Sequence, residues 1–247
     1  MDKKKALKIV QKDGLELEHL PVHFKKDRIV VLEAVKQNGR ALEHVDDSLK
    51  KDRKIVLEAV KEDGFALQYA DDSLKKDKKF ILKAVKQDGY ALEYAHISLR
   101  KDKEIVLEAV KQDGRLLQSS YLPAYFKKDK EIVLEAIKQN VATLEFADKS
   151  LKKDKEVVLE AVKESWNVLD YADKSFLNDK EIILEAVKQD AYALTFANKS
   201  FRKDKKFMLE ALKNDVNATE NGVSALDYID KSLKNDPDIL AIINKKK

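Results

Sequence analysis

One aspartate recurs along the chain at nearly constant spacing, each time in front of the same apolar run. The stretch DKEIVLEAVKQDG at residues 102–114 is a clear example, and the spacing is 25 residues except for 27 after Asp102 and 32 after Asp204. A fixed period of this size is typical of a solenoid, in which each repeat covers its neighbour. The sequence indicates ten repeats, the last one truncated, which begin at Asp2, Asp27, Asp52, Asp77, Asp102, Asp129, Asp154, Asp179, Asp204 and Asp236.

The recurrent aspartate, counted here as position 1, predicts the start of a helix. Its side chain can accept hydrogen bonds from the free amides of a first helical turn. Positions 4, 5, 8 and 9 are apolar and share one face of such a helix, which we expect to be buried. On the opposite side, Glu at position 7 and Lys at position 10 favour exposed ion pairs. These pairs are Glu33 and Lys36, Glu58 and Lys61, Glu108 and Lys111, and Glu160 and Lys163.

A second helix is expected after position 13, where Ala91, Leu92, Ala95 and Leu99 would share one face. Position 13 is Gly in the first five repeats, at Gly14, Gly39, Gly64, Gly89 and Gly114. Gly commonly closes a helix in the left-handed conformation. From the sixth repeat on, position 13 is Val141, Trp166, Ala191 and Val216. These residues enter the left-handed region poorly, so we expect the later turns to be built differently.

The pattern as a whole predicts an all-α fold, an α-solenoid of about ten tandem 25-residue helical-hairpin repeats, the last truncated. We expect one continuous array over residues 1–247. The charged ending NKKK and the truncated last repeat favour a capped monomer over open-ended stacking.

Composition excludes several classes of function. The chain has 49 basic and 45 acidic residues, a net charge of +4, and no cysteine. Disulfides, thiol catalysis and cysteine-based zinc sites are therefore excluded. The sequence contains no apolar run long enough to cross a membrane and no secretory leader, so we expect a cytoplasmic protein with no membrane partner.

We expect no catalytic, metal or cofactor site, and hence no enzyme. His19 and His23 have the spacing of metal ligands on a helix, but Pro21 between them would break the helical turn. The carboxylates recur in every repeat, whereas an active site would depart from the repeat at one place. No nucleophile elbow, phosphate-binding glycine loop or HExxH motif is present.

The stretch NDKEIILEAVKQDAYALTFANKSFRKD, residues 178–204, resembles the repeat family called domain of unknown function 4116. The resemblance covers essentially the whole chain. It implies tandem all-helical modules and carries over no catalytic residue, cofactor or activity.

Position 14 varies between repeats while its neighbours scarcely change, and with position 18 it forms a candidate binding stripe. Four residues apart on one helix, the two positions would pair within each repeat. Arg and aromatic side chains are preferred in interface hot spots. We expect a protein or peptide partner along the second helices, although the rings could instead pack between repeats. The stripe residues are Arg40, His44, Phe65, Tyr69, Tyr90, Tyr94, Arg115, Asn167, Tyr192 and Phe196.

Lysines beside the start of each first helix suggest an alternative, electrostatic nucleic-acid binding along a basic ridge. Interleaved Asp and Glu residues favour instead a solvated edge. A structural spacer is the third hypothesis. The ridge residues are Lys50, Lys51, Lys75, Lys76, Lys152 and Lys153.

Overall fold

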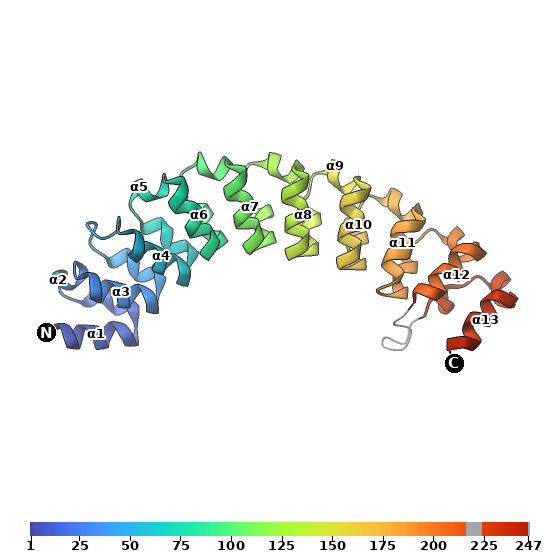
Figure 1. Ribbon diagram of the computed structural model, residues 1–247, viewed down its shortest axis with the longest axis horizontal. Coiled ribbons are helices and arrows are strands. Elements are labelled where there is room, and N and C mark those ends of the chain that lie inside the picture. Colours follow the sequence, from blue (N-terminus) through green and yellow to red (C-terminus); the bar gives the residue numbers. More distant parts are fainter. Residues whose placement is uncertain (216–223, 247) are drawn as a thin grey trace. The chain divides into compact units, whose positions relative to one another are not determined.

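The computed structural model describes residues 1–215 and 224–246. Within these ranges the chain is helical without a strand, which confirms the predicted all-α repeat fold (Figure 1). Contacts divide it into two compact units, Met1–Phe126 and Lys127–Lys247. Each unit is a stack of repeats, and one continuous array over residues 1–247 stays a prediction.

Unit 1 contains five repeats. Its long helices are α1 Lys3–Lys12, α3 Arg28–Gln37, α4 Arg53–Glu62, α6 Lys78–Gln87 and α7 Lys103–Gln112. The 3-10 helices after them are η1 Gly14–His19, η2 Gly39–His44, η3 Gly64–Tyr69, η4 Gly89–Tyr94 and η6 Gly114–Gln118. Short segments complete the repeats, namely α2 Val22–Lys25, α5 Asp72–Lys75 and η5 Leu99–Lys101, while η7 Ala124–Lys128 runs across the boundary between the units.

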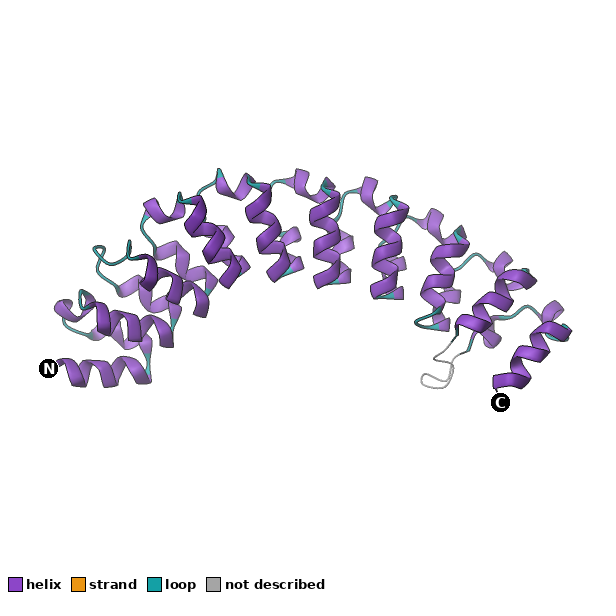
Figure 2. Cartoon of the chain, viewed as in Figure 1, coloured by secondary structure: helices purple, strands orange, loops and turns teal. Residues whose placement is uncertain are grey.

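Unit 2 repeats the scheme. Its long helices are α8 Lys130–Gln139, α10 Lys155–Glu164, α11 Lys180–Val187, α12 Lys205–Asn214 and α13 Pro237–Lys246. The 3-10 helices after them are η8 Val141–Phe146, η9 Trp166–Asp170, η11 Ala191–Thr195 and η13 Ala225–Tyr228. The short segments are α9 Lys149–Lys152, η10 Lys174–Asn178, η12 Lys199–Lys203 and η14 Lys231–Leu233. Short loops join the segments from α8 to α12 (Figure 2).

Each long helix packs against the next one within its unit. In unit 1, α3 contacts both α1 and α4, and α6 contacts α4 and α7. The predicted apolar face forms the core: in α4 the buried residues are Ile55, Val56, Ala59 and Val60. The 3-10 helix adds Ala66 and Leu67, and Leu74 of α5 completes the repeat's contribution. Repetition thus makes a core that one repeat could not make alone.

Three side-chain caps divide a repeat into three segments. Asp52 accepts from the backbone N–H groups of Lys54 and Ile55 at the start of α4, as predicted for position 1. Asp63 then accepts from the N–H of Phe65 at the start of η3. Asp71 accepts from the N–H of Ser73 and opens α5.

The second helix differs from the expected single helix, because it is a 3-10 helix followed by a separate short turn. The N–H of Asp71 donates across to the carbonyl of Lys50 in the preceding repeat, at 3.0 Å. That N–H is therefore not available to continue the helix begun at Gly64. The same bond joins the N–H of Asp173 to the carbonyl of Lys152 in unit 2, also at 3.0 Å.

The expected left-handed glycine at position 13 was wrong. None of Gly14, Gly39, Gly64 and Gly89 has a φ angle in the left-handed region. The glycines instead allow close approach of the next repeat. A Cβ on Gly14 would lie 2.2 Å from the carbonyl oxygen of Ala34, and one on Gly39 would lie 2.3 Å from that of Ala59. In these repeats the glycine therefore leaves room for the next repeat and is not needed for its own backbone conformation.

The expectation that repeats without this glycine build a different turn was also wrong. Asn140, before Val141, has φ −156° and ψ 108°, and Asp63, before Gly64, has φ −156° and ψ 112°. A 3-10 helix follows in both repeats. The same type of helix begins at Trp166 and Ala191, whereas Val216 lies outside the described residues. The local turn is thus independent of glycine.

Ion pairs join consecutive repeats within each unit. The basic residue at position 2 of one repeat contacts the capping aspartate at position 1 of the next. Each of these carboxylates therefore binds its own helix and the preceding one. The pairs are Lys3–Asp27, Arg28–Asp52, Arg53–Asp77 and Lys78–Asp102 in unit 1, and Lys130–Asp154, Lys155–Asp179, Lys180–Asp204 and Lys205–Asp236 in unit 2.

Candidate functional site

The stripe residues of unit 1 lie on the 3-10 helices, at positions 14 and 18 of their repeats. Position 14 is two residues after the second cap, so its side chain lies in the first turn of the 3-10 helix. Arg40 is the most exposed stripe residue with a defined partner: its side chain is 62% exposed, and Nε donates to Oδ2 of Asp63 at 2.8 Å. The carboxylate belongs to the next repeat, so this ion pair joins two consecutive repeats at the stripe.

Aromatic stripe residues contact one another between repeats. The ring of Phe65 stacks on that of Tyr90 in the next repeat, with centroids 5.7 Å apart, and meets the edge of Tyr94 at 5.9 Å. All three rings are half-buried. The expected pairing within a repeat is not seen at Phe65 and Tyr69 in the described ring contacts; Phe65 instead meets two rings of the next repeat.

Two stripe residues converge on one carboxylate. The Tyr90 hydroxyl donates to Oδ2 of Asp113 at 3.0 Å, and Nη2 of Arg115 donates to the same oxygen at 2.7 Å. The hydrogen bonds from Arg115 lower the pKa of Asp113 below its ordinary value, against a smaller opposing effect of burial. Asp113 is thus ionised at neutral pH and fixes both side chains.

The remaining histidine and tyrosine of the stripe lie beside glutamates. Nε2 of His44 is 3.8 Å from Oε2 of Glu18 in the preceding repeat. Hydrogen bonding to Glu43, together with burial, raises the pKa of Tyr69. Both side chains are half-buried. Position 18 is therefore partly a packing position between repeats.

In unit 2 the rings of the stripe pack around Trp166, which was not predicted to be a site residue. Its ring centroid lies 5.4 Å from that of Tyr192 and 5.7 Å from that of Phe196, both in the next repeat. Here the pairing expected within a repeat is seen, since Tyr192 and Phe196 meet at 6.3 Å. Asn167 is exposed and its Oδ1 accepts from the Ser165 hydroxyl. A signal for Trp166 was available, because it is the one tryptophan of the chain.

A surface hollow of about 470 Å³ lies along the stripe in unit 1. Leu15, Arg40 and Phe65, the position 14 residues of three consecutive repeats, all line it. The side chain of Leu15 is 38% exposed. Carboxylates of Asp63 and Asp88 lie in the same wall. The hollow therefore offers apolar contacts beside both signs of charge.

Most ridge lysines have partners within their unit. Lys50 and Lys75 contact Asp47 at 3.0 Å and Asp72 at 3.5 Å, and Lys153 contacts Asp173 at 3.7 Å. Nζ of Lys152 donates to the backbone carbonyl of Glu145 at 2.6 Å.

The other two ridge lysines, Lys51 and Lys76, are exposed and have no carboxylate within 4 Å in the described part of the chain. Lys76 lacks a partner because of one substitution in the next repeat. Lys153 contacts Asp173 at position 20 of its next repeat, and the residue at that position after Lys76 is His96. The ridge thus keeps only part of its formal charge unpaired.

Residues 1–215 and 224–246 contain no group of three or more histidine, aspartate or glutamate side chains that could hold a metal ion. No helix in these ranges has the length and apolar character needed to cross a membrane.

The family described as Domain of unknown function (DUF4116) matches most of the chain in overlapping segments, at residues 2–50, 52–100, 77–127, 102–152, 129–177 and 179–221. No curated protein and no solved structure matches the chain. The chain therefore belongs to the DUF4116 family, and the resemblance noted in its repeats is confirmed.

Proposed function

We propose that this member of the family is a non-enzymatic repeat scaffold that binds another protein or peptide through the surface of its 3-10 helices. The observation that carries the proposal is the hollow lined by Leu15, Arg40 and Phe65. Consecutive repeats contribute the same position to it with a different side chain each time. A repeat scaffold with varied residues at one position is a common way to build an extended binding surface.

The chemistry of the hollow supports a protein partner. Arginine and aromatic residues are enriched in interface hot spots, and Leu15 adds an exposed apolar contact. Arg40 is held by Asp63, so its guanidinium is positioned before a partner arrives. Less side-chain entropy is then lost on binding.

The test uses a variant with Arg40→Ala and Leu15→Ser. The matched control is Arg28→Ala, since Arg28 also contacts a carboxylate of the next repeat at 2.8 Å but lies at the start of α3. Tagged chains would be incubated with nuclease-treated native lysate, and retained proteins quantified by mass spectrometry. The proposal requires a protein that the wild-type chain and the control retain and the stripe variant loses. Equal retention by all three chains would contradict it.

The aromatic residues of the stripe can serve both partner binding and packing between repeats. Replacing Phe65, Tyr90 and Tyr192 by Ala removes stripe chemistry, but Phe65 and Tyr90 also stack between repeats. We expect weaker partner retention together with a modest loss of stability. If helicity measured by circular dichroism collapses, these rings serve the core and the hollow rests on Arg40 and Leu15.

Nucleic-acid binding is a second candidate because of one hollow in unit 2. Its volume is about 400 Å³, and Lys149, Lys152, Lys153 and Lys174 line it beside Tyr171. Lysines around an aromatic ring suit phosphate and base contacts. Affinity for a single-stranded oligonucleotide should then fall steeply with salt, and the slope should shrink when Lys152 and Lys153 are changed to Gln. A chain that binds neither nucleic acid nor protein would leave the structural spacer as the function.

A further inference from the structure

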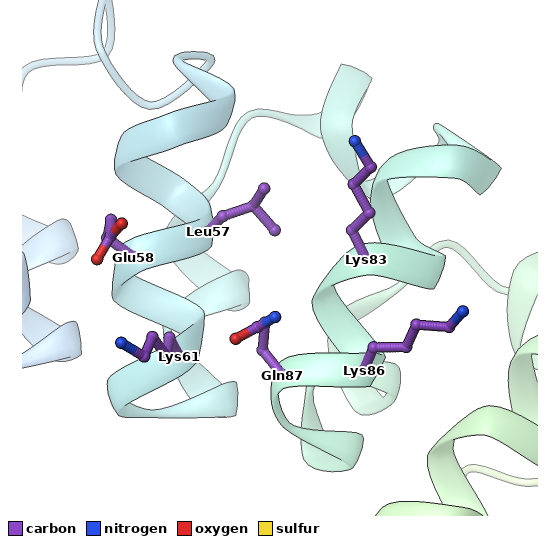
Figure 3. A pocket seen from close by; sticks show the side chains of 6 residues that line it. All are labelled: Leu57, Glu58, Lys61, Lys83, Lys86 and Gln87. Atoms are coloured by element: carbon purple, nitrogen blue, oxygen red, sulfur yellow. The ribbon is translucent and has the colours of Figure 1, made fainter.

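A basic groove lies between α4 and α6 on the long-helix surface of unit 1, and the stripe does not include it. Leu57, Glu58 and Lys61 line it from α4, and Lys83, Lys86 and Gln87 from α6, around a volume of about 270 Å³. In Figure 3 the side chain of Leu57 reaches from α4 toward α6, whereas Glu58 points away from α6. Lys61 and Lys86 extend along the outer sides of α4 and α6, so the gap between the helices holds one apolar side chain with lysines around it.

The charge of the groove comes from one departure from the repeat. Position 7 is Glu in most repeats, but it is Lys83 in the fourth, and α6 contains no acidic residue. Five of the described repeats form an ion pair between positions 7 and 10, as at Glu108 and Lys111, 2.9 Å apart. Lys86 has no such glutamate and reaches Glu108 of the next repeat at 3.7 Å.

Four lysines of α4 and α6 have no carboxylate within 4 Å in the described ranges. They are Lys54, Lys61, Lys79 and Lys83. The predicted pair of Glu58 with Lys61 is not formed within this distance. Of these four, Lys61 and Lys83 line the groove, which thus holds unpaired positive charge.

The equivalent groove in unit 2 has the opposite sign. Between α8 and α10, a volume of about 260 Å³ is lined by Leu134, Ile137, Lys138, Glu156, Glu160 and Glu164. The repeat scaffold therefore produces grooves of nearly equal size, and side chains at a few positions set their charge. The basic groove is a local property of the third and fourth repeats.

We infer that the α4–α6 groove binds an acidic peptide segment that places one apolar side chain against Leu57. Charge complementarity with the lysines supports the acidic residues, and Leu57 supports the apolar one. The run of cations is short, because position 7 is Glu58 on α4 and Glu108 on α7, the helices on either side of Lys83. A nucleic acid would need a longer run of cations to neutralise its phosphates. The inference stands independently of the stripe, since the two surfaces share no residue.

The test measures fluorescence anisotropy with a labelled peptide of sequence EELEELEE, and with EEEEEEEE and single-stranded DNA of similar length as further probes. Lys83→Glu restores the residue that other repeats carry at position 7, so the variant should fold, as circular dichroism would verify. Lys8→Glu is the matched control, because it makes the same change at the same position in α1 of the same unit.

The inference requires that the wild-type chain and Lys8→Glu bind EELEELEE more tightly than EEEEEEEE, and that Lys83→Glu binds it about tenfold more weakly. Three results would overturn it. One is the absence of measurable binding of EELEELEE to the wild-type chain. Another is an equal effect of Lys8→Glu and Lys83→Glu, which would show unspecific attraction. The third is tighter binding of DNA than of EELEELEE with the same dependence on Lys83, which would make the groove a nucleic-acid site.

Discussion

Lys130 and Asp154 connect two consecutive repeats of unit 2 through one carboxylate. Nζ of Lys130 lies 2.8 Å from Oδ2 of Asp154, and Oδ1 of Asp154 accepts from the N–H groups of Glu156 at 3.0 Å and Val157 at 3.3 Å. One side chain thus starts α10 and holds α8 beside it. The same relationship recurs in both units, so the capping aspartate joins repeats as well as beginning helices.

Replacing Asp154 should separate these two roles. Asp154→Asn keeps a good cap and loses the charge, so we expect a loss of less than about 1 kcal/mol, typical of an exposed ion pair. Asp154→Ala loses both and should cost about 1–2 kcal/mol. Urea unfolding followed by circular dichroism measures the difference. Equal destabilisation by the two variants would show that the cap contributes nothing beyond the charge.

Low pH should destabilise the fold, because it protonates the same capping carboxylates. The hydrogen bond from Lys130 and those from the backbone lower the pKa of Asp154, against a smaller opposing effect of burial. Because the folded pKa lies below the unfolded value of about 3.9, the stabilisation is complete above that pH and is lost as the pH falls through the folded pKa.

The melting temperature of the wild-type chain and of Asp154→Asn should therefore differ by a constant amount from pH 7 to about pH 5 and converge below about pH 4. A difference that persists undiminished at pH 2 would show that the charge of Asp154 does not stabilise the fold.

Gly39→Ala tests the close approach of repeats. The new Cβ would lie 2.3 Å from the carbonyl oxygen of Ala59, so α4 must shift, at a cost of about 1–3 kcal/mol. Ala191→Gly is the comparison at the same position in unit 2 and should cost about 0.5–1 kcal/mol by added backbone freedom. A stabilised Gly39→Ala variant would contradict this role of the glycine.

Structural features that are set within one helix could be predicted from the periodicity of the sequence. Features that are set by contacts with a neighbouring repeat could not. The cap at Asp52 and the buried face of α4 follow from spacing within one helix. The role of Gly39 does not, because the atom it avoids belongs to Ala59 in the next repeat. The end of η3 at Tyr69 was missed for the same reason, since the N–H of Asp71 donates to the carbonyl of Lys50 in the preceding repeat.

In the candidate site, too, the contacts with the next repeat could not be predicted. Variation at Arg40 and Phe65 was visible in the sequence, and the structure places both side chains around one hollow. Their partners were not predictable, because Asp63 and Tyr90 lie one repeat further along the chain. A rule for stacking register, added to the repeat alignment, would have been needed.

Gln189 joins two repeats where glycine is absent from position 13. Its Oε1 accepts from the N–H of Trp166 at 2.8 Å, and its Nε2 donates to the carbonyls of Val162 at 2.6 Å and Lys163 at 2.7 Å. Gln189→Ala leaves these partly buried groups unsatisfied and should cost about 1–3 kcal/mol. Gln139→Ala, the same change at the same repeat position on α8 but at an exposed side chain, should cost little. Thermal unfolding of both variants measures the two losses of stability. Equal losses would contradict the role of Gln189 in joining the two repeats.

The measurement that tests the binding surface most directly is site-specific photo-cross-linking in native lysate. A photoreactive phenylalanine analogue would replace Gln37, which lines the hollow beside Arg40, in one chain and Arg28 in another, and cross-linked proteins would be identified after nuclease treatment. The proposed scaffold function predicts a specific protein cross-linked from position 37 and not from position 28. The same cross-links from both positions, or none from position 37, would contradict a partner bound along the 3-10 helices.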